Sequence, residues 1–143
     1  MAPDDRYRLA PVHDARTRAE RVKRGELAVA VGDARGTETA LALAIARVAV
    51  AREALRAALV GHTEITSLAR RVRAERYIAR CRRDLSAAVG EEVRARSAHA
   101  AKLGIIDDAR GTLSRVRAER EVIERHFARW REHRRKLADR RED

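Results

Sequence analysis

Residues 54–64 have the sequence Ala54-Leu55-Arg56-Ala57-Ala58-Leu59-Val60-Gly61-His62-Thr63-Glu64, an apolar run that ends in a glycine. Glycine is favoured just after the last turn of a helix, and threonine is favoured immediately before the first turn of the next. Glu64 then lies in that first turn, where a carboxylate is stabilised. This stretch predicts a turn at residues 61–63 between a helix over about 5–60 and a helix over about 64–141.

Both predicted helices carry residues at coiled-coil spacing. The first has them at Val12, Ala15, Ala19 and Val22, then after a slight phase shift at Leu27, Ala30 and Ala34, and again at Leu41, Ile45, Val48, Arg52, Leu55 and Leu59. The second has them at Ile78, Leu85, Glu92, His99, Ile106, Leu113, Arg120, Phe127 and Arg134, and three residues later at Ala109, Val116, Ile123, Trp130 and Leu137. Such heptads are typical of a seam, the row of positions where two helices meet. We expect an all-α fold, a long antiparallel two-helix coiled-coil hairpin forming a single domain over residues 1–143.

A short repeated phrase leaves a second architecture open. Residues 33–37 and 108–112 both have the sequence Asp-Ala-Arg-Gly-Thr. If Gly36 and Gly111 break the helices, these turns and the one at Gly61 produce a compact four-helix bundle. The sequence does not decide whether they do.

Composition and motifs argue against catalysis. The 143 residues include 33 Lys and Arg against 22 Asp and Glu, a formal net charge of +11. There is no phosphate-binding loop, dinucleotide-binding glycine motif, nucleophile elbow or HExxH zinc motif. Cys81 is the only cysteine, and His126 and His133 are seven residues apart instead of the three or four that suit a helical metal site. We expect no enzymatic activity, no cofactor and no metal site, and the lack of an apolar leader segment favours a cytoplasmic protein.

The position of the turn predicts which residues of the two helices lie opposite each other. With the tip at 61–62, residue i faces a residue near 123−i, and Leu55 and Leu68 pack beside the tip. The second helix then extends beyond the first from about residue 122, and we call this part the C-terminal overhang. It carries an apolar stripe among arginines, which indicates a partner-binding surface. The expected partner-binding residues are Ile123, Phe127, Arg129, Trp130, Arg134, Arg135 and Leu137.

The opening of the chain resembles that of a known family. Residues 7–12 are Tyr-Arg-Leu-Ala-Pro-Val and residues 14–21 are Asp-Ala-Arg-Thr-Arg-Ala-Glu-Arg. Together with the turn near Gly61, the longer second helix and the charged segment 127–132, Phe-Ala-Arg-Trp-Arg-Glu, this resembles the FliJ/YscO family of flagellar and type III secretion export. The similarity lies in size, architecture and Arg/Glu/Ala pattern over nearly the whole chain.

The resemblance implies a non-enzymatic coiled-coil stalk or adaptor that inserts into a hexameric secretion ATPase and couples it to the export gate protein. Some members of the family also escort secretion chaperones, so the resemblance implies this role as well. It implies membrane association only through the export apparatus. The Arg-rich N-terminal segment favours the injectisome branch of the family over the flagellar branch. Two other functions stay open: a generic coiled-coil scaffold, and a basic helical nucleic-acid-binding protein. The acidic residues interleaved with the arginines disfavour nucleic acid as a partner.

Overall fold

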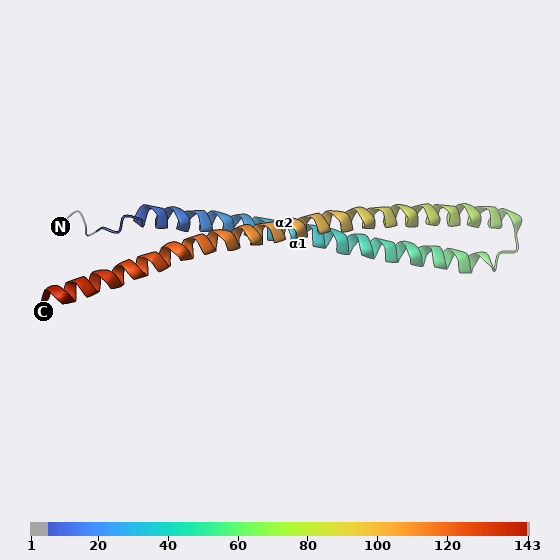
Figure 1. The fold of residues 1–143 in the computed structure, drawn as a ribbon. Coiled ribbons are helices and arrows are strands. Elements are labelled where there is room, and N and C mark those ends of the chain that lie inside the picture. Colours follow the sequence, from blue (N-terminus) through green and yellow to red (C-terminus); the bar gives the residue numbers. More distant parts are fainter. Residues whose placement is uncertain (1–5, 143) are drawn as a thin grey trace. The chain divides into compact units, whose positions relative to one another are not determined.

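The computed structural model describes residues 6–142, with side chains described up to residue 140. Two helices account for nearly all of these residues: α1 covers Ala10–His62 and α2 covers Leu68–Glu142 (Figure 1). The described part of the chain contains no strand, and the two helices contact each other, so the predicted all-α two-helix hairpin is confirmed. Helix α1 begins at Ala10 and not near residue 5, which itself lies outside the described residues.

Neither Gly36 nor Gly111 breaks a helix. Both lie inside long helices, and no residue from 6 to 142 has a positive φ. The compact four-helix bundle requires turns at these two glycines and is therefore excluded. A helical glycine costs about 1 kcal/mol relative to alanine, which is too little to end a helix that packs along its length.

The turn lies later in the chain than its local signals predict. Gly61 and His62 are helical, and the connection consists of residues 63–67. The Thr63 hydroxyl does not cap the second helix but donates to the Val60 carbonyl at 2.8 Å. Ser67 instead precedes α2, and its carbonyl accepts from the Arg71 amide at 2.9 Å. The prediction of a turn at 61–63 was wrong because Gly61 keeps an ordinary helical conformation and does not adopt the left-handed one that would end α1.

The chain divides into two compact units, and each is described by itself. The first unit is Gly32–Gly104, which contains the turn. Its core is a thin row of small and medium-sized side chains, as expected when only two helices pack together. The residues that are at least 91% buried are Ala34, Ala44, Val48, Ile78, Cys81 and Ala88.

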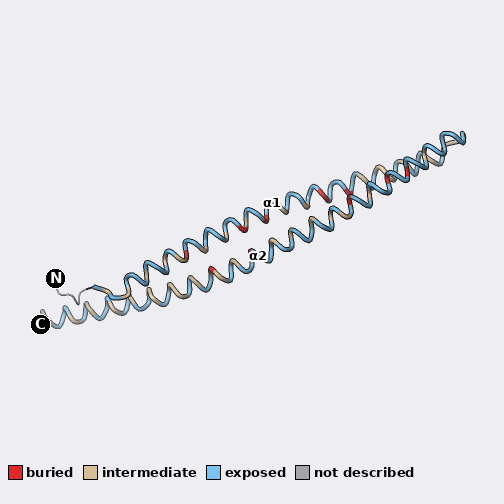
Figure 2. The backbone as a smooth tube through the Cα atoms, turned by 90° about the horizontal axis from the view of Figure 1, so that it is seen from above, coloured by how far each residue is buried: buried red, intermediate tan, exposed pale blue. Residues whose placement is uncertain are grey.

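Figure 2 shows that buried positions recur at intervals along both helices while most of the surface remains exposed. On α2 the predicted seam is correct, with Ile78, Ile106 and Leu113 buried. On α1 the seam was half correct: Val48 is buried, but Ile45 and Leu59 are 46% and 43% exposed. Along the α1 seam an alanine lies three residues after each larger residue, as Ala44 follows Leu41 and Ala51 follows Val48. A small side chain at these positions allows the two helices to approach closely.

Contacts between the helices give the register. In the unit Gly32–Gly104, Arg47 Nη1 lies 3.0 Å from Glu91 Oε2 and Lys102 Nζ lies 3.1 Å from Asp33 Oδ2. Residue i therefore lies opposite a residue between 135−i and 138−i, and not near 123−i. The later turn accounts for only about half of this difference in register, since a shift of about three residues moves each opposing residue by about six. The rest arises because α2 begins beyond the end of α1, where His62 Nε2 lies 3.9 Å from Glu75 Oε1. As a result Leu68 does not pack at the tip and is 77% exposed.

The second unit consists of the residues before Gly32 and after Gly104, and it has the same register. His13 Nε2 lies 3.7 Å from Glu124 Oε1, and Arg16 forms an ion pair with Glu119. The prediction that the C-terminal overhang begins at about residue 122 is therefore wrong, because residues of α2 up to 124 still face α1. His126, Phe127 and Trp130 lie against Tyr7, which precedes α1.

Candidate functional site

Three of the four aromatic residues of the chain gather where the polypeptide enters α1. The Tyr7 ring centroid lies 4.7 Å from that of Phe127 and 5.4 Å from that of Trp130. Phe127 and Trp130 stack on each other at 5.8 Å with an interplanar angle of 15°. We call Tyr7, His126, Phe127 and Trp130 the ring cluster. Through these contacts the residues just before α1 pack against α2.

Tyr7 also anchors the ring cluster through its hydroxyl. The hydroxyl oxygen lies 2.9 Å from His126 Nδ1, and it donates to the Ile123 carbonyl at 3.4 Å. On the other side, the Arg131 guanidinium carbon lies 4.6 Å from the centroid of the Phe127 ring, which is a cation–π contact. Phe127 is thus flanked by Tyr7 and Arg131, and it is half-buried although it was expected to lie open in an overhang.

The predicted partner-binding residues fall into three groups. Ile123, Phe127 and Trp130 come together around Tyr7 and contribute to the fold of this unit. Arg129 is exposed and lines a shallow hollow with Val122, Arg125 and His126. The remaining three continue along α2, and of these Arg135 is exposed while Arg134 and Leu137 are half-buried.

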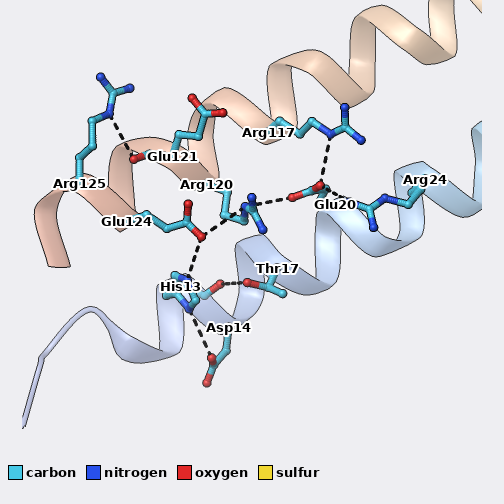
Figure 3. Close-up of polar contacts among 10 residues, drawn as sticks. All are labelled: His13, Asp14, Thr17, Glu20, Arg24, Arg117, Arg120, Glu121, Glu124 and Arg125. Carbon is cyan, nitrogen blue, oxygen red and sulfur yellow. Dashed lines mark hydrogen bonds and ion pairs between the residues drawn. The ribbon is translucent and has the colours of Figure 1, made fainter. Parts of the chain in front are cut away.

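A buried carboxylate forms the second polar feature of this unit. Glu20 of α1 is only 3% exposed, and three arginines surround it (Figure 3). Arg24 Nη2 from the same helix lies 2.6 Å from Glu20 Oε1, and from α2 Arg117 Nε lies 3.3 Å from Oε1. Arg120 Nε lies 3.0 Å from Glu20 Oε2 and 3.6 Å from Glu124 Oε1. We call Glu20, Arg24, Arg117 and Arg120 the Glu20 cluster.

Competing effects act on the acidity of Glu20. Burial raises the pKa of this carboxyl, but hydrogen bonds from Arg24 and Arg117 and the positive charge of Arg120 together lower it below its ordinary value. The carboxylate is therefore ionised at neutral pH and holds two arginines of α2 against α1. A buried charge without these partners would be strongly unfavourable, so the contact favours one register over shifted ones.

The seam of α1 in this unit is mostly polar before Leu27, and that is why the apolar pattern missed much of it. The predicted positions Val12, Ala15 and Val22 are exposed. The apolar residues Ala19, Leu27 and Ala30 are half-buried or buried as their spacing predicts, but the other half-buried or buried positions of α1 before Leu27 are His13, Thr17, Glu20 and Lys23. One signal did point to Glu20: Arg120 occupies a heptad position of α2, and a cation at a seam needs an anion opposite it.

The chemical groups that this unit presents are aromatic rings, arginines and one buried carboxylate. The Glu20 carboxylate is occupied by arginines, and no group of three or more His, Cys, Asp or Glu side chains that could hold a metal ion occurs among the described residues. What the site offers is a set of rings and exposed arginines on a rigid helix, the residue types that dominate protein interfaces.

No protein-family model, curated protein or solved structure matches this chain. Among the described residues, neither helix contains a stretch that is both long and apolar enough to span a bilayer.

Proposed function

We propose that this chain is a non-enzymatic coiled-coil stalk or adaptor of a type III secretion export apparatus, injectisome or flagellar. In this role it is cytoplasmic, inserts into a hexameric secretion ATPase, couples that ATPase to the export gate protein, and escorts secretion chaperones. It takes no cofactor and no small-molecule substrate. The observation that carries the proposal is the antiparallel pairing of two long helices, the architecture implied by the resemblance of residues 7–21 to the FliJ/YscO family.

Charge and side-chain type further support a protein partner at the end of α2. Arg129 and Arg135 are exposed there, and Arg134 and Leu137 are half-buried on the same helix. Arginine provides several donors on one rigid group, so it suits carboxylates and backbone carbonyls lining a pore. Since Phe127 and Trp130 pack around Tyr7, we assign the partner contact chiefly to α2 from residue 132 onward, with Arg129 beside it, and not to the whole stripe from residue 123.

The experiment measures ATP hydrolysis by the purified secretion ATPase of the same organism, with and without this protein. Truncation after Arg131 keeps the ring cluster intact, so the protein should fold normally but lose most of its stimulation of the ATPase. Truncation after Val122 removes the rings that cover Tyr7 and should in addition lower the melting temperature. Equal stimulation by the full chain and the chain ending at Arg131 would contradict the assigned contact.

A matched pair of charge reversals controls for nonspecific electrostatics. Arg135→Glu should weaken binding to the ATPase, whereas Arg83→Glu, at another exposed position of α2, should leave it unchanged. Failure of the full chain to bind or stimulate the ATPase would refute the proposed function. Tight binding to DNA with a steep loss of affinity on adding salt would favour the nucleic-acid alternative instead.

A further inference from the structure

One face of α1 in the unit Gly32–Gly104 is exposed yet uncharged. We call it the α1 outer face, and its residues, all exposed, are Gly32, Gly36, Thr39, Leu43, Ala46 and Val50. Their spacing alternates between four and three residues, which is the spacing of a coiled-coil seam. Leu43 and Val50 are 58% and 71% exposed. Six consecutive uncharged seam positions are notable in a chain in which 38% of the residues are charged.

The α1 outer face borders an apolar hollow in the same unit. Leu43, Ala46 and Val50 line this hollow together with Cys81 and Ala88 of α2 and a few neighbouring residues. A helix lying on the α1 outer face would therefore cover apolar side chains that the hairpin alone leaves in water.

We infer that the α1 outer face binds a second copy of this chain, with the two α1 helices antiparallel about a two-fold axis near residue 41. Side-chain size supports this occupant. In the antiparallel arrangement Val50 lies opposite Gly32 of the second copy, Ala46 opposite Gly36, and Leu43 opposite Thr39. Val50 and Leu43 thus each meet a smaller residue, and Ala46 with Gly36 lets the two backbones approach, as close packing requires.

The packing of α1 on α2 does not require glycine at positions 32 and 36. A Cβ atom placed on Gly32 or Gly36 would have no heavy atom within 4 Å beyond the adjacent helix backbone, and neither residue has a positive φ. Neither turn geometry nor close approach of α2 accounts for glycine at these positions. A second helix packed directly against them does, because glycine permits the closest approach of two helices.

Charges beside the α1 outer face complement each other in the same arrangement. Asp33 and Arg47 lie on the same flank, so the two-fold axis places Asp33 of each copy near Arg47 of the other. Their side chains are 53% and 68% exposed, which leaves room for a second partner besides Lys102 and Glu91. Arg35 lies on the opposite flank, where it faces the alanines at positions 42 and 49 of the second copy. No pair of like charges is therefore placed in contact.

The inference does not depend on the proposed function, and its test uses the full-length chain alone. Sedimentation velocity over a series of concentrations should show a reversible dimer. Leu43→Glu places a charge in the centre of the interface and should raise the dimer dissociation constant by roughly tenfold or more. A chain that stays monomeric at every concentration, or a dimer that Leu43→Glu leaves unchanged, would overturn the inference.

Two charge reversals test the antiparallel arrangement directly. Asp33→Arg alone should weaken the dimer because arginine then faces Arg47, and Arg47→Asp alone should weaken it because aspartate then faces Asp33. An equimolar mixture of the two variants should restore dimers, since each heterodimer regains both opposite-charge contacts. Glu38→Arg, at an exposed position outside the face and its flanks, is the matched control and should not weaken the dimer. A mixture that fails to recover would overturn the proposed arrangement.

Gly36→Ala should change monomer stability and dimer affinity in opposite directions, which a glycine outside the interface would not do. Gly36→Ala should raise the melting temperature of the dilute monomer, because alanine is the better helix former. The same substitution should raise the dimer dissociation constant, because the added methyl group holds the two helices apart. An increase in both monomer stability and dimer affinity would show that Gly36 does not lie in the interface.

Discussion

The contact between Tyr7 and Phe127 provides the sharpest test of the register. If residue 7 faces residue 127, the two rings should stabilise each other in a double-mutant cycle built from Tyr7→Leu and Phe127→Leu. The ring centroids are 4.7 Å apart and tilted by 53°, a geometry that contributes about 0.5–1.5 kcal/mol beyond the area buried. Since both rings are half-buried, we expect a coupling energy in the lower part of that range, about 0.5–1 kcal/mol.

Thermal and urea unfolding followed by circular dichroism would measure this coupling. For a chain of this size 1 kcal/mol corresponds to a shift in melting temperature of roughly 2–4 °C, so the coupling is resolvable. Tyr77→Leu combined with Phe127→Leu is the matched control, because the Tyr77 ring lies over Arg80 and takes part in no ring pair among the described residues. Coupling as small as that of the control would show that Tyr7 does not cover Phe127 and would refute the register near the ring cluster.

Three further predictions follow from burial, charge and helix propensity. Leu113→Ala should destabilise the protein by about 2–3 kcal/mol because Leu113 is 4% exposed, whereas Leu103→Ala, at a residue 46% exposed, should cost less than half as much in the same urea titration. Because the pKa of Glu20 is lowered by folding, its stabilising effect is present above the ordinary glutamate pKa and is lost as pH falls through the lowered value. Glu20→Gln should therefore melt at a lower temperature at pH 7 and lose less stability than the parent between pH 5 and pH 3; parallel melting curves across that range would contradict this. Gly111→Ala should raise stability by about 0.5–1 kcal/mol, since the added Cβ meets no heavy atom within 4 Å, and a lower melting temperature would indicate an unrecognised close contact.

The fold class and the seam of α2 could be predicted from the amino-acid pattern alone. Ile78, Ile106 and Leu113 lie seven residues or a multiple of seven apart, and all three are buried against α1. A repeat sustained over so many turns cannot be satisfied except by another helix alongside, so local pattern and tertiary packing agree. The approximate region of the connection could also be predicted, because the apolar repeat of α1 ends near His62.

The register, and with it the composition of the candidate site, depends on contacts between the two helices that the local pattern does not reveal. Ending α1 at Val60 or continuing it by two residues to His62 differs by about 1 kcal/mol in local preference, so the sequence around the turn could not fix the tip. The register follows instead from many contacts between residues far apart in sequence, such as Arg47 with Glu91 and Tyr7 with Phe127. Glu20 illustrates the same point: a lone glutamate on a helix is typical of exposed surface, and only the arrival of Arg117 and Arg120 from α2 makes its burial favourable.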